Sequence, residues 1–192
     1  MKEQIWKALW RYSERQIQHI PDEIYAVVAF VLIIGITASL GWKGLKTGLR
    51  YSAGLLLMGD VFLIFCSTVF LRKVGKIHKY DFHPFWSYSR PDLLVENIMN
   101  VVVFIPIGMI LGLLLRFKGS WLLAALIGCS ISVAIETLQF YFKRGFSEVD
   151  DVMHNTLGCM IGFGIVTIVR IVFETRYNKH NNFFQNPPSP FV

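Results

Sequence analysis

The 192-residue sequence has few charged residues and few cysteines, and both shortages narrow the class of protein to which it belongs. Charged side chains make up 17% of the chain and hydrophobic ones 54%, whereas charged residues reach about 25% in ordinary soluble domains. This balance argues against a soluble enzyme, a disordered protein and a DNA-binding module. It predicts one compact integral membrane domain. The net charge of +6 comes from basic residues that flank apolar runs, where we expect membrane lipids rather than nucleic acid as partners.

The sequence also lacks the short motifs of several chemistries. Its three cysteines, Cys66, Cys129 and Cys159, lie inside apolar runs without a C-x-x-C pair, which argues against a disulfide framework and a zinc site. There is no G-x-x-x-x-G-K-[ST] loop for ATP and no G-x-S-x-G serine context. We therefore expect no cofactor and assign no metal ligand.

Long apolar runs are what the sequence does contain. They cover residues 24–40, 51–71, 98–115, 121–142 and 152–169, about half of the chain. At a rise of about 1.5 Å per residue each crosses a bilayer core of about 30 Å once its flanks are included. No Lys or Arg lies within them, and only Asp60, Glu136 and His154 interrupt their apolar character. Because lipid offers no hydrogen bonds to the backbone, we predict an all-α bundle of about five transmembrane helices.

The regions outside these runs complete the predicted organisation. Residues 1–23 carry apolar and tryptophan positions at helical spacing with charges between them, which predicts an amphipathic interfacial helix. Residues 24–71 then form two N-terminal transmembrane helices, and 72–173 a long loop with three more. Residues 174–192, rich in Asn and Pro, are expected to form a mobile tail.

Polar residues gather at the ends of the last three predicted helices. Up-and-down connectivity brings the start of the third helix, the end of the fourth and the start of the fifth to one end of the bundle. The predicted binding residues at this end are Asn100, Glu136, Gln139, Arg144, Asp150, Asp151 and Asn155. Two G-x-x-x-G patterns, at 108–112 and 158–162, favour close packing of the third and fifth helices deeper in the bundle.

Several roles remain open for these residues. Glu136 is a candidate acid/base catalyst or headgroup contact, or else a buried ion-pair partner of Arg144. Asp150 and Asp151 either interact favourably with the helix dipole or act with Glu136. In the second case the three residues are catalytic candidates, or a three-carboxylate cluster that binds a divalent ion. The amide side chains either bind envelope sugars or phosphates or link helices by hydrogen bonds.

Charge counts favour one membrane orientation. Lys and Arg counts over whole loops disagree with net charge, but the short loops 41–50 and 116–120 are purely basic. The positive-inside rule applies best to such short loops. We therefore expect a multi-pass protein of the bacterial plasma membrane whose polar end faces the extracytoplasmic side.

An ordered set of motifs in the second half of the chain resembles the VanZ-like membrane protein family. The motifs are Asn100-x3-Phe104-x-Pro106-x-Gly108, Glu136-x2-Gln139-x4-Arg144 and Asp150-Asp151-x3-Asn155-x2-Gly158, after an upstream Pro84-Phe85. The resemblance covers about 84–164. It implies a link to glycopeptide resistance, in particular to reduced teicoplanin susceptibility, and it supplies no mechanism.

Three kinds of function fit these observations. The first is a membrane protein that binds or modulates a lipid-linked or glycan-containing envelope component. The second is an intramembrane enzyme that acts on a lipid or peptidoglycan-precursor headgroup with carboxylate acid/base or metal chemistry. The third is a structural role, in which the polar set only holds three helices together. The sequence leaves open whether any reaction is catalysed.

Overall fold

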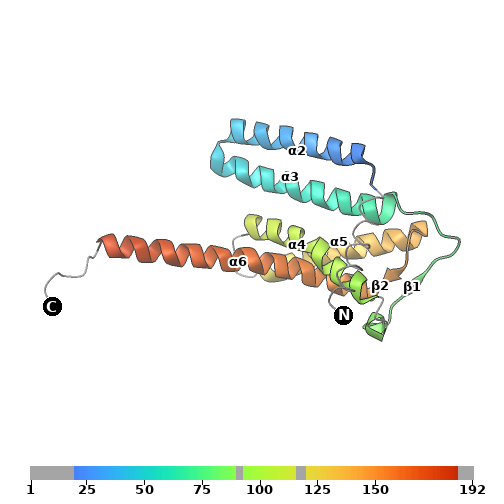
Figure 1. Ribbon diagram of the computed structural model, residues 1–192. Helices are drawn as coiled ribbons and strands as arrows, with labels where there is room; N and C mark the ends of the chain where they lie inside the picture. Colours follow the sequence, from blue (N-terminus) through green and yellow to red (C-terminus); the bar gives the residue numbers. More distant parts are fainter. Residues whose placement is uncertain (1–19, 90–92, 116–119, 186–192) are drawn as a thin grey trace, which may run out of the picture.

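The computed structural model describes residues 20–89, 93–115 and 120–185, and within them the chain is almost entirely helical (Figure 1). The long helices are α2 (Asp22–Lys43), α3 (Leu45–Phe65), α4 (Leu94–Leu114), α5 (Ser120–Phe142) and α6 (Val149–Gln185). A π-helical turn, η1 (Cys66–Phe70), continues α3, and a 3-10 turn, η2 (Trp86–Ser89), precedes α4. Two two-residue strands, β1 (Tyr80–Asp81) and β2 (Ser147–Glu148), pair in parallel.

Five helices in the described residues are long and apolar enough to cross a membrane. These segments are Asp22–Gly41, Leu45–Phe70, Leu94–Leu114, Ser120–Phe142 and Val149–Tyr177. The prediction of an all-α structure with five helices able to cross a membrane is confirmed. Each helix begins before its apolar run. Asp22 and Glu23, for example, occupy the first turn of α2, where acids favour the positive end of the helix dipole.

Both ends of the described chain differ from what the sequence predicted. The first described helix, α2, is a candidate membrane span and not an interfacial helix. The amphipathic segment predicted at 1–23 lies outside the described residues up to position 19. At the other end α6 runs on to Gln185, so the first part of the segment expected to be a mobile tail is helical. The remainder, from 186, lies outside the described residues.

Glycines bring α4 and α6 into contact along their length. A Cβ atom built on Gly108 would lie 1.9 Å from the carbonyl oxygen of Cys159, and one on Gly162 would lie 2.0 Å from that of Ile105. A Cβ on Gly158 would lie 2.1 Å from the carbonyl oxygen of Val101. Only glycine permits such backbone approaches. The predicted close packing of the third and fifth spans is therefore confirmed.

The helices divide into a core and a peripheral hairpin. The buried apolar residues, among them Phe104, Ile107 and Phe163, come mainly from α4, α5 and α6. The α2–α3 hairpin lies along one side of this core, with α2 outermost (Figure 1), and none of the apolar window of α2 is buried. In a membrane the exposed apolar surface of α2 is therefore available to lipid or to a partner. The polar end of the core is where β1, β2 and η2 lie.

Candidate functional site

A cavity of about 310 Å³ opens at the polar end of the core, between η1, α4, α5 and the start of α6. Its polar lining residues are Ser67, Thr68, Arg72, Glu96, Asn100, Glu136, Gln139, Glu148, Asp151 and Asn155. Its apolar wall is formed by Ile64, Leu93, Met99, Val103, Phe104, Ile135 and Phe146. We call it the acidic cavity, because four carboxylates line it and Arg72 is its one Lys or Arg among the described residues.

Five of the seven predicted binding residues line the acidic cavity. They are Asn100, Glu136, Gln139, Asp151 and Asn155. The other two, Arg144 and Asp150, do not line it. Asp150 and Asp151, adjacent at the start of α6, thus have different surroundings. The sequence pattern alone did not distinguish them.

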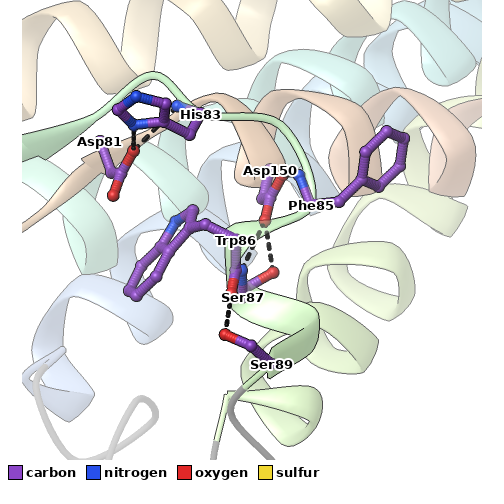
Figure 2. Close-up of polar contacts among 7 residues, drawn as sticks. All are labelled: Asp81, His83, Phe85, Trp86, Ser87, Ser89 and Asp150. Atoms are coloured by element: carbon purple, nitrogen blue, oxygen red, sulfur yellow. Dashed lines mark hydrogen bonds and ion pairs between the residues drawn. The ribbon is translucent and has the colours of Figure 1, made fainter.

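Asp150 is fully buried and holds the loop before α4 in place (Figure 2). Its Oδ1 accepts a hydrogen bond of 2.6 Å from the backbone N–H of Phe85. Its Oδ2 accepts one of 3.0 Å from the backbone N–H of Ser87 and one of 2.5 Å from the Ser87 hydroxyl. We call this set of contacts the Asp150 clamp. Both carboxylate oxygens thus have hydrogen-bond donors within the protein, which gives Asp150 a structural role.

The Asp150 clamp has further supports on both sides. Asn97 of α4 donates to the Ser87 hydroxyl oxygen at 3.0 Å. Nδ1 of His154, one turn along α6, lies 2.6 Å from the Asp150 carbonyl oxygen, and its Nε2 lies 2.8 Å from the Tyr88 hydroxyl. The loop from β1 to η2 is therefore fastened to both α4 and α6, and it closes one side of the polar end.

Arg144 binds backbone rather than Glu136. Its guanidinium donates to the carbonyl oxygens of Val69 and Arg72, each at 3.1 Å, and to that of Phe70. These carbonyls end the π-helical turn η1, where helix geometry leaves acceptors without partners. Among the described residues no ion pair joins Arg144 to Glu136, so the ion pair considered from the sequence is not formed. Arg144 holds η1 against the α5–α6 loop.

The amide groups of the acidic cavity have defined orientations. Gln139 Nε2 donates to the Thr68 carbonyl oxygen at 3.2 Å, and a carbonyl only accepts. The Oε1 atom is therefore on the other side of the amide, where it is buried and has no hydrogen-bond partner among the described residues. Asn100 Nδ2 donates to Asp151 Oδ1 at 2.7 Å, and Asn155 Nδ2 donates to the Ser132 hydroxyl oxygen at 2.8 Å. In each case the amide NH₂ is directed at a protein acceptor.

The carboxylates are packed close enough to influence one another. Glu136 Oε2 accepts a hydrogen bond of 3.0 Å from the backbone N–H of Glu148. Burial, and then the negative charge of Asp151, raise the pKa of Glu148 to about 8. A bound cation would relieve this repulsion and favour the ionised form.

Sequence reasoning missed several residues of the acidic cavity. Arg72, Glu96 and Glu148 lie just outside the apolar runs, in segments that the sequence identified only as loops or helix ends. The glycine at position 145 was a possible sequence signal, and its φ in the structure is +142°. A Cβ there would lie 2.8 Å from Arg72 Nη1 and 3.2 Å from Gln139 Oε1, so glycine leaves room for both side chains.

A second hollow, of about 360 Å³, adjoins the acidic cavity and shares Arg72 and Phe146 with it. Its charged lining residues are Arg72, Lys73, Lys79 and Lys143. We call it the basic hollow. Side by side, the two sites offer carboxylates on one side and cationic groups on the other, an arrangement suited to a ligand that carries both signs of charge.

Metal binding and Asp60 are not supported as parts of this site. Among the described residues, no group of three or more His, Cys, Asp or Glu side chains is placed to hold a metal ion. The three-carboxylate cluster considered from the sequence is not formed, since Asp150 belongs to the clamp. Asp60 lies within α3 and does not line the acidic cavity. Its Oδ2 is buried without a hydrogen-bond partner among the described residues.

Comparison with known proteins finds a family model that matches most of the chain and a curated relative that matches part of it. A family model described as VanZ/LLP1 matches residues 8–170. Protein VanZ of Enterococcus faecium is 31% identical over 87 residues, which are 45% of this chain and 48% of that protein. The chain thus aligns with about half the length of this curated relative. No solved structure matches the chain.

Proposed function

The chain belongs to the VanZ/LLP1 family, and we propose that it binds the phosphate-bearing headgroup of a cell-envelope lipid at the polar end of its membrane-spanning bundle. One observation carries the proposal: the basic hollow and the acidic cavity adjoin at this end and share Arg72. Lys and Arg side chains are common phosphate ligands. Carboxylates and amides orient the polar groups beyond the phosphate.

The position of the site within the bundle supports a lipid rather than a soluble ligand. The acidic cavity lies where η1, α4, α5 and α6 meet, and all of these belong to candidate membrane spans. Its apolar wall continues the core of the bundle through Ile64 and Phe104. In this proposal the polar end faces the extracytoplasmic side, which the purely basic loops 41–50 and 116–120 support.

The proposal is tested by identifying lipids that co-purify with the protein. Mass spectrometry compares wild type with Glu136→Gln, which keeps the size of a cavity side chain. Thr137→Val serves as the matched control, because Thr137 is exposed on the same helix. We expect wild type and Thr137→Val to retain one lipid class that Glu136→Gln loses several-fold. Equal lipid content in all three proteins contradicts the proposal.

The link to antibiotic susceptibility and the membrane orientation have their own tests. In cells that lack the protein we expect altered teicoplanin susceptibility, restored by wild type and not by Glu136→Gln. Single cysteines placed in 72–97 and in 116–120 are labelled from outside intact cells with a membrane-impermeant reagent. We expect labelling in 72–97, and labelling at 116–120 alone overturns the orientation.

A second candidate function is an intramembrane enzyme that uses carboxylate acid/base chemistry on the same headgroup. The observation in its favour is Glu148, whose pKa is raised to about 8 beside Asp151, within the range useful to a general acid near neutral pH. Incubation with the co-purified lipid, followed by mass spectrometry, decides between the two. Release of a headgroup fragment that Glu148→Gln abolishes would establish the enzyme, and unchanged lipid favours binding alone.

A further inference from the structure

The most informative atom in the acidic cavity is Gln139 Oε1. Gln139 is 3% exposed, and its Nε2 is fixed by the Thr68 carbonyl oxygen. The amide oxygen therefore faces away from Thr68 and is a buried acceptor with no partner among the described residues. A buried polar atom without a hydrogen-bond partner is energetically unfavourable. A ligand group that donates a hydrogen bond would remove this penalty.

The charged side chains around Gln139 Oε1 indicate the charge of the ligand group that donates to it. Glu96, Glu136, Glu148 and Asp151 line the same cavity, and the only Lys or Arg lining it in the described ranges is Arg72. Arg72 is exposed and also lines the basic hollow, which places it at the boundary between the two sites. A cationic donor would be attracted by the negative charge of these carboxylates, whereas a neutral hydroxyl would not.

The size of the acidic cavity limits the ligand further. Its volume of about 310 Å³ lies at the lower end of the range for small-molecule sites, which begins at about 300 Å³. A single small headgroup fills such a volume, whereas an extended glycan does not fit within it. The adjoining basic hollow then remains for the phosphate of the same headgroup.

From these three observations we propose that the acidic cavity binds the primary ammonium group of a zwitterionic phospholipid headgroup, with the headgroup phosphate on the basic hollow. This inference rests on the proposed function and specifies the class of headgroup. Gln139 Oε1 and the carboxylates accept hydrogen bonds from the ammonium group. The amide NH₂ groups of Asn100 and Asn155 remain bound to protein acceptors.

A comparison of three lipids with the full-length protein tests the inference. Native mass spectrometry of detergent-solubilised wild type reads the bound fraction from an equimolar mixture of phosphatidylethanolamine, phosphatidylcholine and phosphatidylglycerol. The first carries an ammonium with N–H donors, the second the same charge without donors, and the third hydroxyl donors without a positive charge. We expect phosphatidylethanolamine to be enriched on the order of ten-fold over both others, as expected for one charge-assisted hydrogen bond.

The variant Asp151→Asn places a neutral amide where the cavity has a carboxylate. It keeps Oδ1 as the acceptor for Asn100, so the interhelical hydrogen bond is retained. We expect the enrichment of phosphatidylethanolamine to fall below about two-fold, equivalent to about 0.4 kcal/mol, while the control Thr137→Val keeps the wild-type value. The wild-type selectivity decides the question even where a variant folds poorly.

The outcomes separate this inference from the proposed function. Equal binding of phosphatidylethanolamine and phosphatidylglycerol, reduced in Arg72→Gln, overturns the ammonium site and leaves headgroup binding standing. Equal binding of phosphatidylethanolamine and phosphatidylcholine shows that charge suffices and overturns the role of Gln139 Oε1 as hydrogen-bond acceptor. Absence of all three lipids from wild type overturns the ammonium site, and the lipid that co-purifies with wild type then decides whether the proposed headgroup binding stands.

Discussion

Two neighbouring acids, Asp150 and Asp151, stand at the start of α6 and belong to two different regions of the molecule. Asp150 accepts three hydrogen bonds in the Asp150 clamp and is fully buried. Asp151 lines the acidic cavity, where it meets an amide and other carboxylates. Because successive helical residues point in directions about 100° apart, adjacency in sequence does not place them in one site. A region whose polar atoms are satisfied within the protein builds structure, and one that retains an unpartnered acceptor is suited to a ligand.

The largest expected effect is the replacement of Asp150 by Asn. One side-chain oxygen becomes an NH₂ group, which cannot accept from the backbone N–H that it faces, that of Phe85 at the Oδ1 position or that of Ser87 at the Oδ2 position. We expect a loss of about 3 kcal/mol in the free energy of unfolding, since hydrogen bonds to a charged group are worth about 1.5–3 kcal/mol each. Thermal unfolding in detergent measures it. An unfolding temperature equal to that of wild type contradicts the structural role of the clamp.

Arg144→Gln is expected to have the next largest effect. The guanidinium holds carbonyl oxygens at the end of η1, and its loss leaves these acceptors without that donor. We expect a destabilisation of about 2 kcal/mol with the same selectivity among lipid headgroups. The measurements are thermal unfolding and native mass spectrometry on the folded fraction. A change in headgroup selectivity without a loss of stability would show that Arg144 contributes to the ligand site.

Gly145→Ala probes the point where Arg72 and Gln139 approach each other. The new Cβ would lie 2.8 Å from Arg72 Nη1, at a backbone φ of +142°. We expect a destabilisation of about 1 kcal/mol from the backbone strain, together with reduced lipid binding because Arg72 must move. Lipid occupancy per folded protein is the decisive measurement. Occupancy equal to that of wild type would show that Arg72 does not position the headgroup.

The smallest expected effect is a pH dependence set by Glu148. Its pKa is raised from 4.5 to about 8 in the folded protein, chiefly by burial and then by Asp151. Between these values the folded state binds the proton more tightly than the unfolded state, so stability is greatest below about pH 4.5 and falls as pH rises towards 8. Glu148→Gln is expected to flatten this profile in thermal unfolding between pH 5 and pH 8. Four other carboxylates lie near Glu148, those of Glu96, Glu136, Asp150 and Asp151, so an unchanged slope would assign the pH dependence to one of them.

The sequence predicted the architecture well because its evidence is strong and local. The apolar runs allow few alternatives in lipid, and the G-x-x-x-G patterns identified the two helices that approach most closely. Five of the seven proposed binding residues line one cavity, since up-and-down connectivity sets which helix ends meet.

Other parts of the site depend on tertiary contacts that no local pattern encodes. The role of Asp150 is set by N–H groups more than sixty positions earlier in the chain. Arg144 likewise donates to carbonyl oxygens of η1. The apolar run beginning at 51 predicted a single helix there and gave no sign of this π-helical turn. Arg72 and Glu148 enter the cavity from segments without periodicity. Charge and helical spacing indicated where polar residues gather, but hydrogen bonding decides which of them remain available.

One paired measurement tests the central claim most directly: unfolding temperature and lipid occupancy, recorded together for Asp150→Asn and Asp151→Asn. The account predicts that Asp150→Asn is markedly destabilised and that its folded fraction keeps the bound headgroup. It predicts that Asp151→Asn unfolds within a few degrees of wild type and binds several-fold less phosphatidylethanolamine. Equal destabilisation by both variants, or full lipid occupancy in Asp151→Asn, would contradict the division between the Asp150 clamp and the acidic cavity.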